Sequence, residues 1–339
     1  MKQIRTEDAV GQVLCHDMTQ IIPGEYKGPR FKKGHIVTEE DIPVLLSMGK
    51  ENLYVFELRA GMLHENDAAE RMCTLCLNDG MERGEPGEGK IELFAARDGL
   101  FRVDRERLDA VNAIDELMIA TRHGNTAVRA GDKLAGTRVI PLVIEEKKLA
   151  EAEAIVGGKP LLELLPFKLR RAGVVTTGSE VFHGRIEDKF TPVVAQKLAA
   201  FGIEMTEHRT VGDGVENIRA AIDELRGTGV ELILCTGGMS VDPDDNTPGA
   251  IRASGARIVT YGAPVLPGAM FLLGYFDDGR PVMGLPGCVM YARSTIFDLV
   301  LPRVAAGVEL TRRDFTTLGE GGLCLGCKPC TYPNCGFGK

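Results

Sequence analysis

The sequence contains no apolar run of about 18 residues, the length that a membrane-spanning helix requires. Its first residues, MKQIRTEDAVGQVL, also lack the apolar stretch of a signal peptide. Positive charge is scarce, since 40 Lys and Arg stand against 48 Asp and Glu and give a formal net charge of −8. This balance excludes a general binder of nucleic acid or anionic membranes, but not a local pocket for a small anion. We therefore expect a cytoplasmic protein without nucleic-acid or membrane partners, whose nine cysteines are mostly reduced.

The first half of the chain predicts small mixed modules. At 339 residues, two or three domains are expected. We place an α+β module at 1–78 and a β-rich module at 79–165. Thr38 and Asp41 predict the start of a short helix ending at Gly49, followed by a strand at 53–58 and a helix at 65–78. Asp98-Gly99, between two apolar runs, predicts a β-hairpin.

The second half, at 168–308, alternates strand and helix patterns. Short apolar strands are predicted at 172–177, 203–211, 230–235 and 281–286, and helices at 191–202, 214–227 and 288–304. This alternation predicts an α/β domain, a mostly parallel sheet with helices on both faces. Ligands bind such sheets outside the carboxyl ends of the strands. The informative loops are therefore 176–180, 211–214, 236–248 and 285–288.

These loops combine glycines with carboxylates. Glycines at a helix start let backbone N–H groups reach a phosphate or another anion. Carboxylates would repel such an anion unless Mg²⁺ or another divalent cation bridged the two. The candidates for this role are Glu180, Asp213, Asp242, Asp244 and Asp245.

Simpler interpretations of the same loops stay open. Asp213, followed by Glu216, could be an ordinary helix cap. Thr247-Pro248 could be an N-cap and first-turn pair, and Leu285-Pro286-Gly287 could be a turn.

The order of several motifs resembles a known domain. TTGSEV, GRIEDKFTPVVAQKLAAFGIE, ILCTGGMSVDPDDNTPGAI, APVLPGAMFLLG and PVMGLPGCVMY follow one another across residues 170–306. Together they resemble the molybdopterin-binding domain (MoaB/Mog type) of molybdenum-cofactor biosynthesis proteins. The opening EDAVGQVLCHDMT and the multi-domain layout resemble the molybdotransferase branch (MoeA and gephyrin E-domain type) more than the adenylyltransferase branch (Mog type).

The resemblance implies a ligand, a reaction and a set of site residues. The ligand would be molybdopterin or adenylylated molybdopterin, and the reaction would be the insertion of molybdate with a divalent cation. A non-catalytic molybdopterin-binding carrier or regulator is the alternative. Catalysis would fall to Asp213 and Asp245, and Mg²⁺ would be held by Asp213, Asp242 and Asp245. The residues implied to bind molybdopterin are Thr177, Gly178, Ser179, Glu180, Thr236, Gly237, Gly238, Met239, Ser240, Pro286 and Gly287.

The sequence departs from the molybdotransferase pattern at three places. Ser179 stands where the pattern TGDE has an aspartate, and Cys288 and Val289 replace the end of LPGNP. Ala269 stands where the pattern PGK has a lysine, which would be a counter-ion for molybdate or phosphate. The non-catalytic alternative depends on these departures.

The tail at 309–339 carries a second motif. Cys324, Cys327, Cys330 and Cys335 have C-x2-C-x2-C-x4-C spacing, close to the C-x2-C-x2-C-x3-C run of bacterial ferredoxins. The spacing predicts a metal centre, an iron–sulfur cluster or, as the alternative, structural zinc. No core is expected around it, so the tail should bind metal independently and could dock a molybdoenzyme or a redox partner.

The remaining cysteines and the assembly state are predicted from simpler signals. Cys73, Cys76 and Cys235 fall on apolar faces and are expected to be buried thiols. A homo-oligomer is expected.

Overall fold

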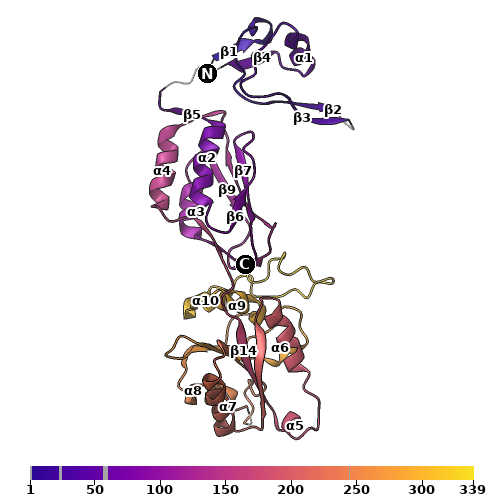
Figure 1. The fold of residues 1–339 in the computed structure, drawn as a ribbon, viewed down its shortest axis with the longest axis vertical. Coiled ribbons are helices and arrows are strands. Elements are labelled where there is room, and N and C mark those ends of the chain that lie inside the picture. Colours follow the sequence, from indigo (N-terminus) through magenta and orange to yellow (C-terminus); the bar gives the residue numbers. More distant parts are fainter. Residues whose placement is uncertain (1, 23–24, 56–59, 244) are drawn as a thin grey trace. The chain divides into compact units, whose positions relative to one another are not determined.

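The computed structural model describes residues 2–22, 25–55, 60–243 and 245–339, which form two compact units (Figure 1). The first unit comprises the chain up to residue 97 together with 102–124 and 129–164, and the second comprises 98–101, 125–128 and 165–339. Over these described ranges, no helix combines the length and the apolar character that a bilayer crossing demands.

The N-terminal part of the first unit is a small α+β structure. β1 (Lys2–Arg5) pairs antiparallel with β4 (Asn52–Val55), and β2 (Met18–Ile22) pairs antiparallel with β3 (Tyr26–Phe31). The predicted helix is confirmed as α1 (Asp41–Ser47), but its N-cap residue is Glu40 and not Thr38. The Asp41 carboxylate accepts a hydrogen bond from the Thr38 amide at 2.8 Å. The predicted strand at 53–58 is confirmed up to Val55, and its last residues lie outside the described residues.

The rest of the first unit is built around an antiparallel sheet with the strand order β6-β7-β11-β9. These strands are Met81–Arg83, Lys90–Ala95, Lys133–Val139 and Leu117–Thr121. β5 (Met62–His64) pairs with β12 (Val143–Glu145), and β13 spans Leu162–Leu165. The helices are α2 (Glu65–Cys76), α3 (Arg105–Asn112) and α4 (Glu146–Val156). Cys73 and Cys76 are buried on α2, as predicted.

The predicted hairpin at Asp98-Gly99 is wrong. β7 (Lys90–Ala95) pairs with β6 and β11, whereas β8 (Gly99–Val103) pairs with β10 (Thr126–Val128), so the turn joins strands of different sheets. Gly99, Leu100 and Phe101 are buried in succession. A strand covered on both faces cannot be the half-exposed arm of a simple hairpin.

The second unit contains a six-stranded sheet with the order β15-β14-β16-β19-β18-β17. β15, β14, β16 and β19 run parallel, and β18 is antiparallel to both of its neighbours. The predicted mostly parallel sheet is therefore confirmed. Its strands are β14 (Arg171–Thr177), β15 (Glu204–Val211), β16 (Leu232–Thr236), β17 (Arg257–Tyr261), β18 (Leu272–Tyr275) and β19 (Pro281–Leu285).

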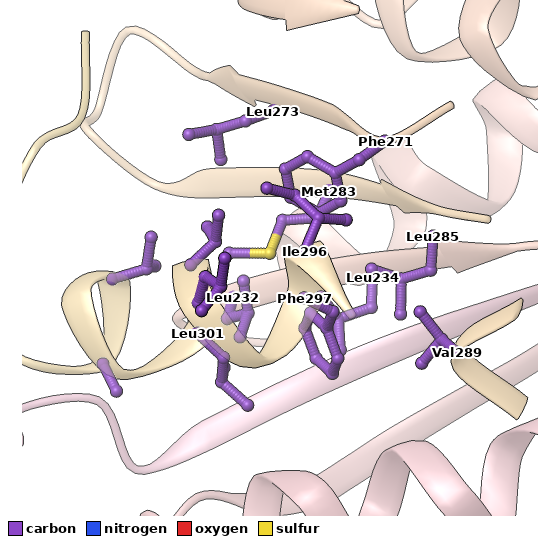
Figure 2. Packing of buried hydrophobic residues seen from close by; sticks show 14 of the residues in the cluster. Leu232, Leu234, Phe271, Leu273, Met283, Leu285, Val289, Ile296, Phe297 and Leu301 are labelled. Atoms are coloured by element: carbon purple, nitrogen blue, oxygen red, sulfur yellow. The ribbon is translucent and has the colours of Figure 1, made fainter. Parts of the chain in front are cut away.

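Helices cover both faces of this sheet, because alternate residues of each buried strand point to opposite sides. Leu232 and Leu234 pack in one cluster with α6 (Phe190–Ala199) and α9 (Ile296–Ala305). Ile233 and Cys235 pack in the other with α7 (Val215–Gly227) and α8 (Thr247–Ala253). Figure 2 shows the first cluster, in which Phe297 of α9 lies against the side chains of the central strands.

One predicted helix of this unit begins later than the sequence indicated. Residues 287–290 form a single 3₁₀ turn, and α9 starts only at Ile296. Thr295 and Asp298 form a capping box there, so the helix start is fixed by side-chain bonds to its first N–H groups.

The C-terminal tail belongs to the second unit. After α10 (Arg312–Thr316), residues 317–339 form turns and irregular structure. Phe337 is only 5% exposed within the cluster that contains α6 and α9, and Cys324, Tyr332 and Cys335 pack against that cluster. The expectation that the tail has no core around it is therefore wrong.

Candidate functional site

The loops after four parallel strands lie along one edge of the six-stranded sheet. In the strand register, Thr177 is opposite Val211, Thr176 is opposite Thr236, and Thr236 is opposite Leu285. The strands therefore end side by side, and the loops at 178–180, 212–214, 237–246 and 286–288 leave the sheet together. This confirms the placement that the strand–helix alternation predicted.

Buried threonines join the loops after β14 and β16. The Thr177 hydroxyl donates to the carbonyl of Thr236 at 3.1 Å and lies 3.4 Å from the Thr247 hydroxyl. Thr247 in turn donates its hydroxyl to the Gly237 carbonyl at 2.8 Å and its amide to the Gly238 carbonyl at 3.2 Å. The two loops are held in one arrangement before any ligand arrives.

This arrangement explains the paired glycines. Gly237 and Gly238 have φ values of +86° and +56°, in the region where side chains are strained. A Cβ on Gly237 would lie 2.3 Å from the Thr177 carbonyl oxygen, and one on Gly238 would lie 3.0 Å from the Thr247 hydroxyl oxygen. The close approach that requires glycine is thus made by the protein's own chain. Thr247 is the first residue of α8, with Asn246 at the N-cap, so the interpretation of Thr247 as an N-cap is wrong.

Asp213 connects the loop after β15 to the loop after β14. One carboxylate oxygen accepts the backbone amide of Ser179 at 2.9 Å. Gly214 is the N-cap residue of α7, and no side chain caps that helix, so the interpretation of Asp213 as its cap is wrong. Glu180, the next residue of the short helix α5 (Ser179–Phe182), is exposed.

The acidic segment after β16 closes on itself. The Asp242 amide donates to the Asp245 carboxylate at 3.2 Å, and the Asp245 amide donates to the Asp242 carbonyl at 2.9 Å. Tyr261 of β17 donates its hydroxyl to the Met239 carbonyl at 3.0 Å. Burial and the Asp245 charge raise the pKa of Tyr261, which keeps this donor protonated. Asp244 lies outside the described residues.

The carboxylates do not form a ready-made cation site. Over the residues that the structure describes, no group of three or more His, Cys, Asp or Glu side chains is arranged to hold a metal ion. Asp213, Asp242 and Asp245 are therefore not a three-ligand set by themselves. A divalent cation beside them would need further oxygen ligands from a bound phosphate or from water.

The remaining candidate residues divide by exposure. Met239 is 4% exposed, and a Cβ on Gly284 of β19 would lie 2.4 Å from its sulfur, so its side chain belongs to the core. Pro286 is also buried. Ser240 and Gly287 are exposed, and a Cβ on Gly287 would have no atom within 4 Å. The open surface of the site therefore includes the backbone at 287 and the side chain at 240.

A polar network beside this edge was missed from the sequence. The Thr176 hydroxyl lies 2.9 Å from Nε2 of His208 on β15 and 3.2 Å from the Asp188 carboxylate, which also accepts the Thr191 amide at 3.0 Å. Burial raises the pKa of Asp188, but the hydrogen bonds from Thr191, Phe190 and Thr176 lower it by more. The net result is a pKa below the ordinary value of an aspartate. Asp188 and Thr191 have i, i+3 spacing before a helix, a capping pattern that could have revealed them.

The cysteines fall into two chemical groups. Burial raises the pKa of Cys76 and Cys235 to about 12, and burial also raises that of Cys288. In the tail, the Tyr332 amide and the Ser294 hydroxyl lower the pKa of Cys330. Cys76 and Cys235 are buried, as predicted, whereas the Cys330 thiol is the more easily ionised.

Family models match two parts of the chain. Residues 173–306 match a model described as a probable molybdopterin binding domain, and residues 3–57 match one described as a domain of unknown function. The first match contains the four parallel strands and all the loops described above. It covers less than half of the chain.

Curated relatives match a shorter stretch. A CinA-like protein from Mycolicibacterium vanbaalenii is 40% identical over 77 residues, which cover 23% of this chain and 18% of that protein. A CinA-like protein from Mycobacterium tuberculosis is 38% identical over 77 residues, with the same coverage. The chain thus spans about a fifth of the length of these relatives.

The solved structures with similarity include molybdenum- and tungsten-cofactor proteins and a CinA protein of unknown function from Thermoplasma acidophilum. The molybdopterin biosynthesis enzyme MoaB from Thermus thermophilus is 22% identical, with 41% of this chain and 98% of that chain covered and a TM-score of 0.34. The tungsten cofactor synthesizing protein MoaB from Pyrococcus furiosus is 22% identical, with 36% and 84% covered and a TM-score of 0.31.

Proposed function

We propose that the second unit binds molybdopterin or adenylylated molybdopterin at the sheet edge, and that the protein acts in molybdenum-cofactor biosynthesis as a molybdotransferase-like enzyme. The observation that carries the proposal is the convergence of four strand-end loops, joined by the Thr177–Thr236 and Ser179–Asp213 hydrogen bonds, inside the segment that matches the molybdopterin binding model. A preorganised polar surface of this kind lowers the entropic cost of fixing a small ligand.

The exposed groups suit an anionic, polar ligand. Ser240 and the open backbone at Gly287 are available for hydrogen bonds. Asp245 and Asp242 would hold a divalent cation jointly with the ligand's phosphate, since neither the carboxylates nor the phosphate would supply enough oxygens alone. In this proposal the cation neutralises charge between the phosphate and the acidic turn, while the protein positions both.

Binding is tested with two matched glycine variants. Gly287→Leu places a side chain over the open backbone at a position where a Cβ would meet no protein atom within 4 Å and no positive φ is required. Gly227→Leu is the control, because Gly227 is equally unhindered but ends α7, a helix that starts at the site and runs away from it. Calorimetry with anaerobically prepared molybdopterin should show binding to wild type and to the control, and at least about tenfold weaker binding to Gly287→Leu. Equal affinity in all three proteins would remove this edge as the site.

Turnover is tested separately from binding. The assay follows the conversion of adenylylated molybdopterin and molybdate to a cofactor that activates an apo-molybdoenzyme. Asp245→Asn should lower turnover by about 100-fold or more if the carboxylate takes part through a cation, because the amide is a poorer cation ligand. Circular dichroism and urea unfolding would separate this effect from a loss of fold.

The alternative is a carrier or regulator that binds the same ligand without converting it. It is favoured by Ala269, which replaces the lysine of the molybdotransferase pattern. Wild-type protein that binds molybdopterin with the expected glycine dependence but gives no active cofactor would establish this alternative.

A further inference from the structure

The four tail cysteines surround a single cavity. The cavity has a volume of about 250 Å³, and its lining includes Cys324, Cys327, Cys330 and Cys335 together with Ser294 and Tyr332. The four cysteines lie at four separate points of an irregular loop, and all of them line this one cavity. Because no disulfide forms among the described cysteines, all four thiols are available as ligands.

The loop that carries them is anchored at several points. The Gly338 amide donates to the Gly321 carbonyl at 2.9 Å and closes the segment into a ring. Tyr332 donates its hydroxyl to the Asp298 carbonyl of α9 at 2.9 Å, and Phe337 is buried in the domain core. The Cys324 amide donates to the Leu266 carbonyl at 2.8 Å. The cavity is thus held by the folded domain rather than by the tail alone.

The size of the cavity distinguishes between the kinds of metal centre. The four cysteines do not form a group arranged around one ion. A single zinc ion draws four sulfurs to about 2.3 Å from one point. A cavity volume of about 250 Å³ leaves room for a body of several atoms between the thiols. In a [4Fe–4S] cluster each of the four cysteines binds its own iron, so the sulfurs stay farther apart.

From this geometry we propose that the tail cavity is the binding site of one [4Fe–4S] cluster, ligated by Cys324, Cys327, Cys330 and Cys335. The Ser294 hydroxyl lies 3.7 Å from the Cys330 sulfur and would remain as a hydrogen-bond donor to a bound thiolate. Cys327 and Leu325 are exposed, the latter by 81%, so one side of the cluster would face solvent. That side is where a small electron carrier or a redox protein could approach. This proposal does not depend on the molybdopterin site.

The test uses the full-length chain, purified without oxygen and then reconstituted with ferrous iron, sulfide and thiol. We expect about four irons and four acid-labile sulfides per chain, visible charge-transfer absorption that bleaches with dithionite, and an electron paramagnetic resonance signal from the reduced protein. Cys327→Ser and Cys330→Ser each remove a direct ligand of the cluster and should each lower the iron content well below that of wild type. Cys288→Ser is the matched control, since Cys288 does not line the cavity, and it should keep the wild-type iron content.

Several results would overturn the proposal. One zinc per chain without sulfide in the anaerobic protein would assign the cysteines to a single-metal site. An absence of iron after reconstitution, or full iron content in both tail variants, would remove the cavity as a cluster site. Cys327 is exposed, so its replacement by serine should leave the circular dichroism spectrum unchanged and make iron loss in that variant attributable to the missing ligand.

Discussion

The contact between Asp213 and Ser179 makes the most specific prediction about the candidate site. Its two partners are 34 residues apart and come from the loops after adjacent strands, so the bond fixes one loop against the other. Asp213→Ala removes the acceptor of this hydrogen bond, so the Ser179 amide can donate only to water. Asp213→Asn keeps an acceptor oxygen at nearly the same place. The two variants therefore separate the need for an acceptor from the need for a charge.

The expected magnitudes follow from the geometry. A 2.9 Å bond to a carboxylate that is half-buried should be worth about 1 kcal/mol, below the ~1.5–3 kcal/mol of fully buried charged bonds. Asp213→Ala should therefore lower the free energy of unfolding by about 1 kcal/mol, a shift of about 2–4 °C in Tm for a unit of this size. Asp213→Asn should lose less than half of that.

Urea unfolding followed by circular dichroism measures these differences through the midpoint at constant m-value. If Asp213→Ala were as stable as wild type, the contact would contribute nothing in solution and the preorganisation of the two loops would lose its basis. If Asp213→Asn kept its stability but lost turnover by about 100-fold, Asp213 would have a catalytic role beyond positioning.

Three further variants test the surrounding structure. Gly237→Ala should cost about 3 kcal/mol, because the added Cβ meets the Thr177 carbonyl and the positive φ is strained, whereas Gly287→Ala should be neutral in the same unfolding experiment. The pKa of Asp188 is depressed in the folded protein, so its carboxylate stabilises the fold fully at pH values above the ordinary pKa of 3.8 and loses this effect as the pH falls through the lower folded pKa. The difference in unfolding free energy between wild type and Asp188→Asn should therefore narrow in acid. A difference that widens in acid would contradict this prediction. Phe337→Ala should cost about 3 kcal/mol because the ring is 5% exposed, while Phe182→Ala, at a site 54% exposed, should cost little, and equal effects would mean that the tail is not packed on the domain.

The parallel sheet could be predicted because its signals are local. The runs at 172–177 and 230–235 are continuously apolar, the helix at 214–227 has a clear helical period, and the alternation of strands with helices determines which ends of the strands meet. β18 was missed because it has only four residues, and so short an apolar run cannot be told from a segment of a buried helix.

Contacts between distant residues could not be predicted in the same way. Nothing in the sequence around Asp213 identifies Ser179 as its partner, and helix capping was an equally good interpretation of the local pattern. The glycine pair at 237–238 was expected to let a ligand approach the backbone, and in the structure the groups that approach it are Thr177 and Thr247 of the same chain. Long-range packing also determines the position of the tail. Its sequence has no periodic pattern, and the hydrophobic contacts of Phe337 and Tyr332 hold it against the domain.

The measurement that tests the central claim most directly is hydrogen–deuterium exchange of the full-length protein with and without molybdopterin under anaerobic conditions. The account predicts slower exchange on ligand addition at the amides of residues 237–240 and 287–288, with little change in residues 60–97, 102–124 and 129–164 of the other unit. Protection confined to that other unit, or an unchanged sheet edge at saturating ligand, would contradict the proposal that this edge is the molybdopterin site.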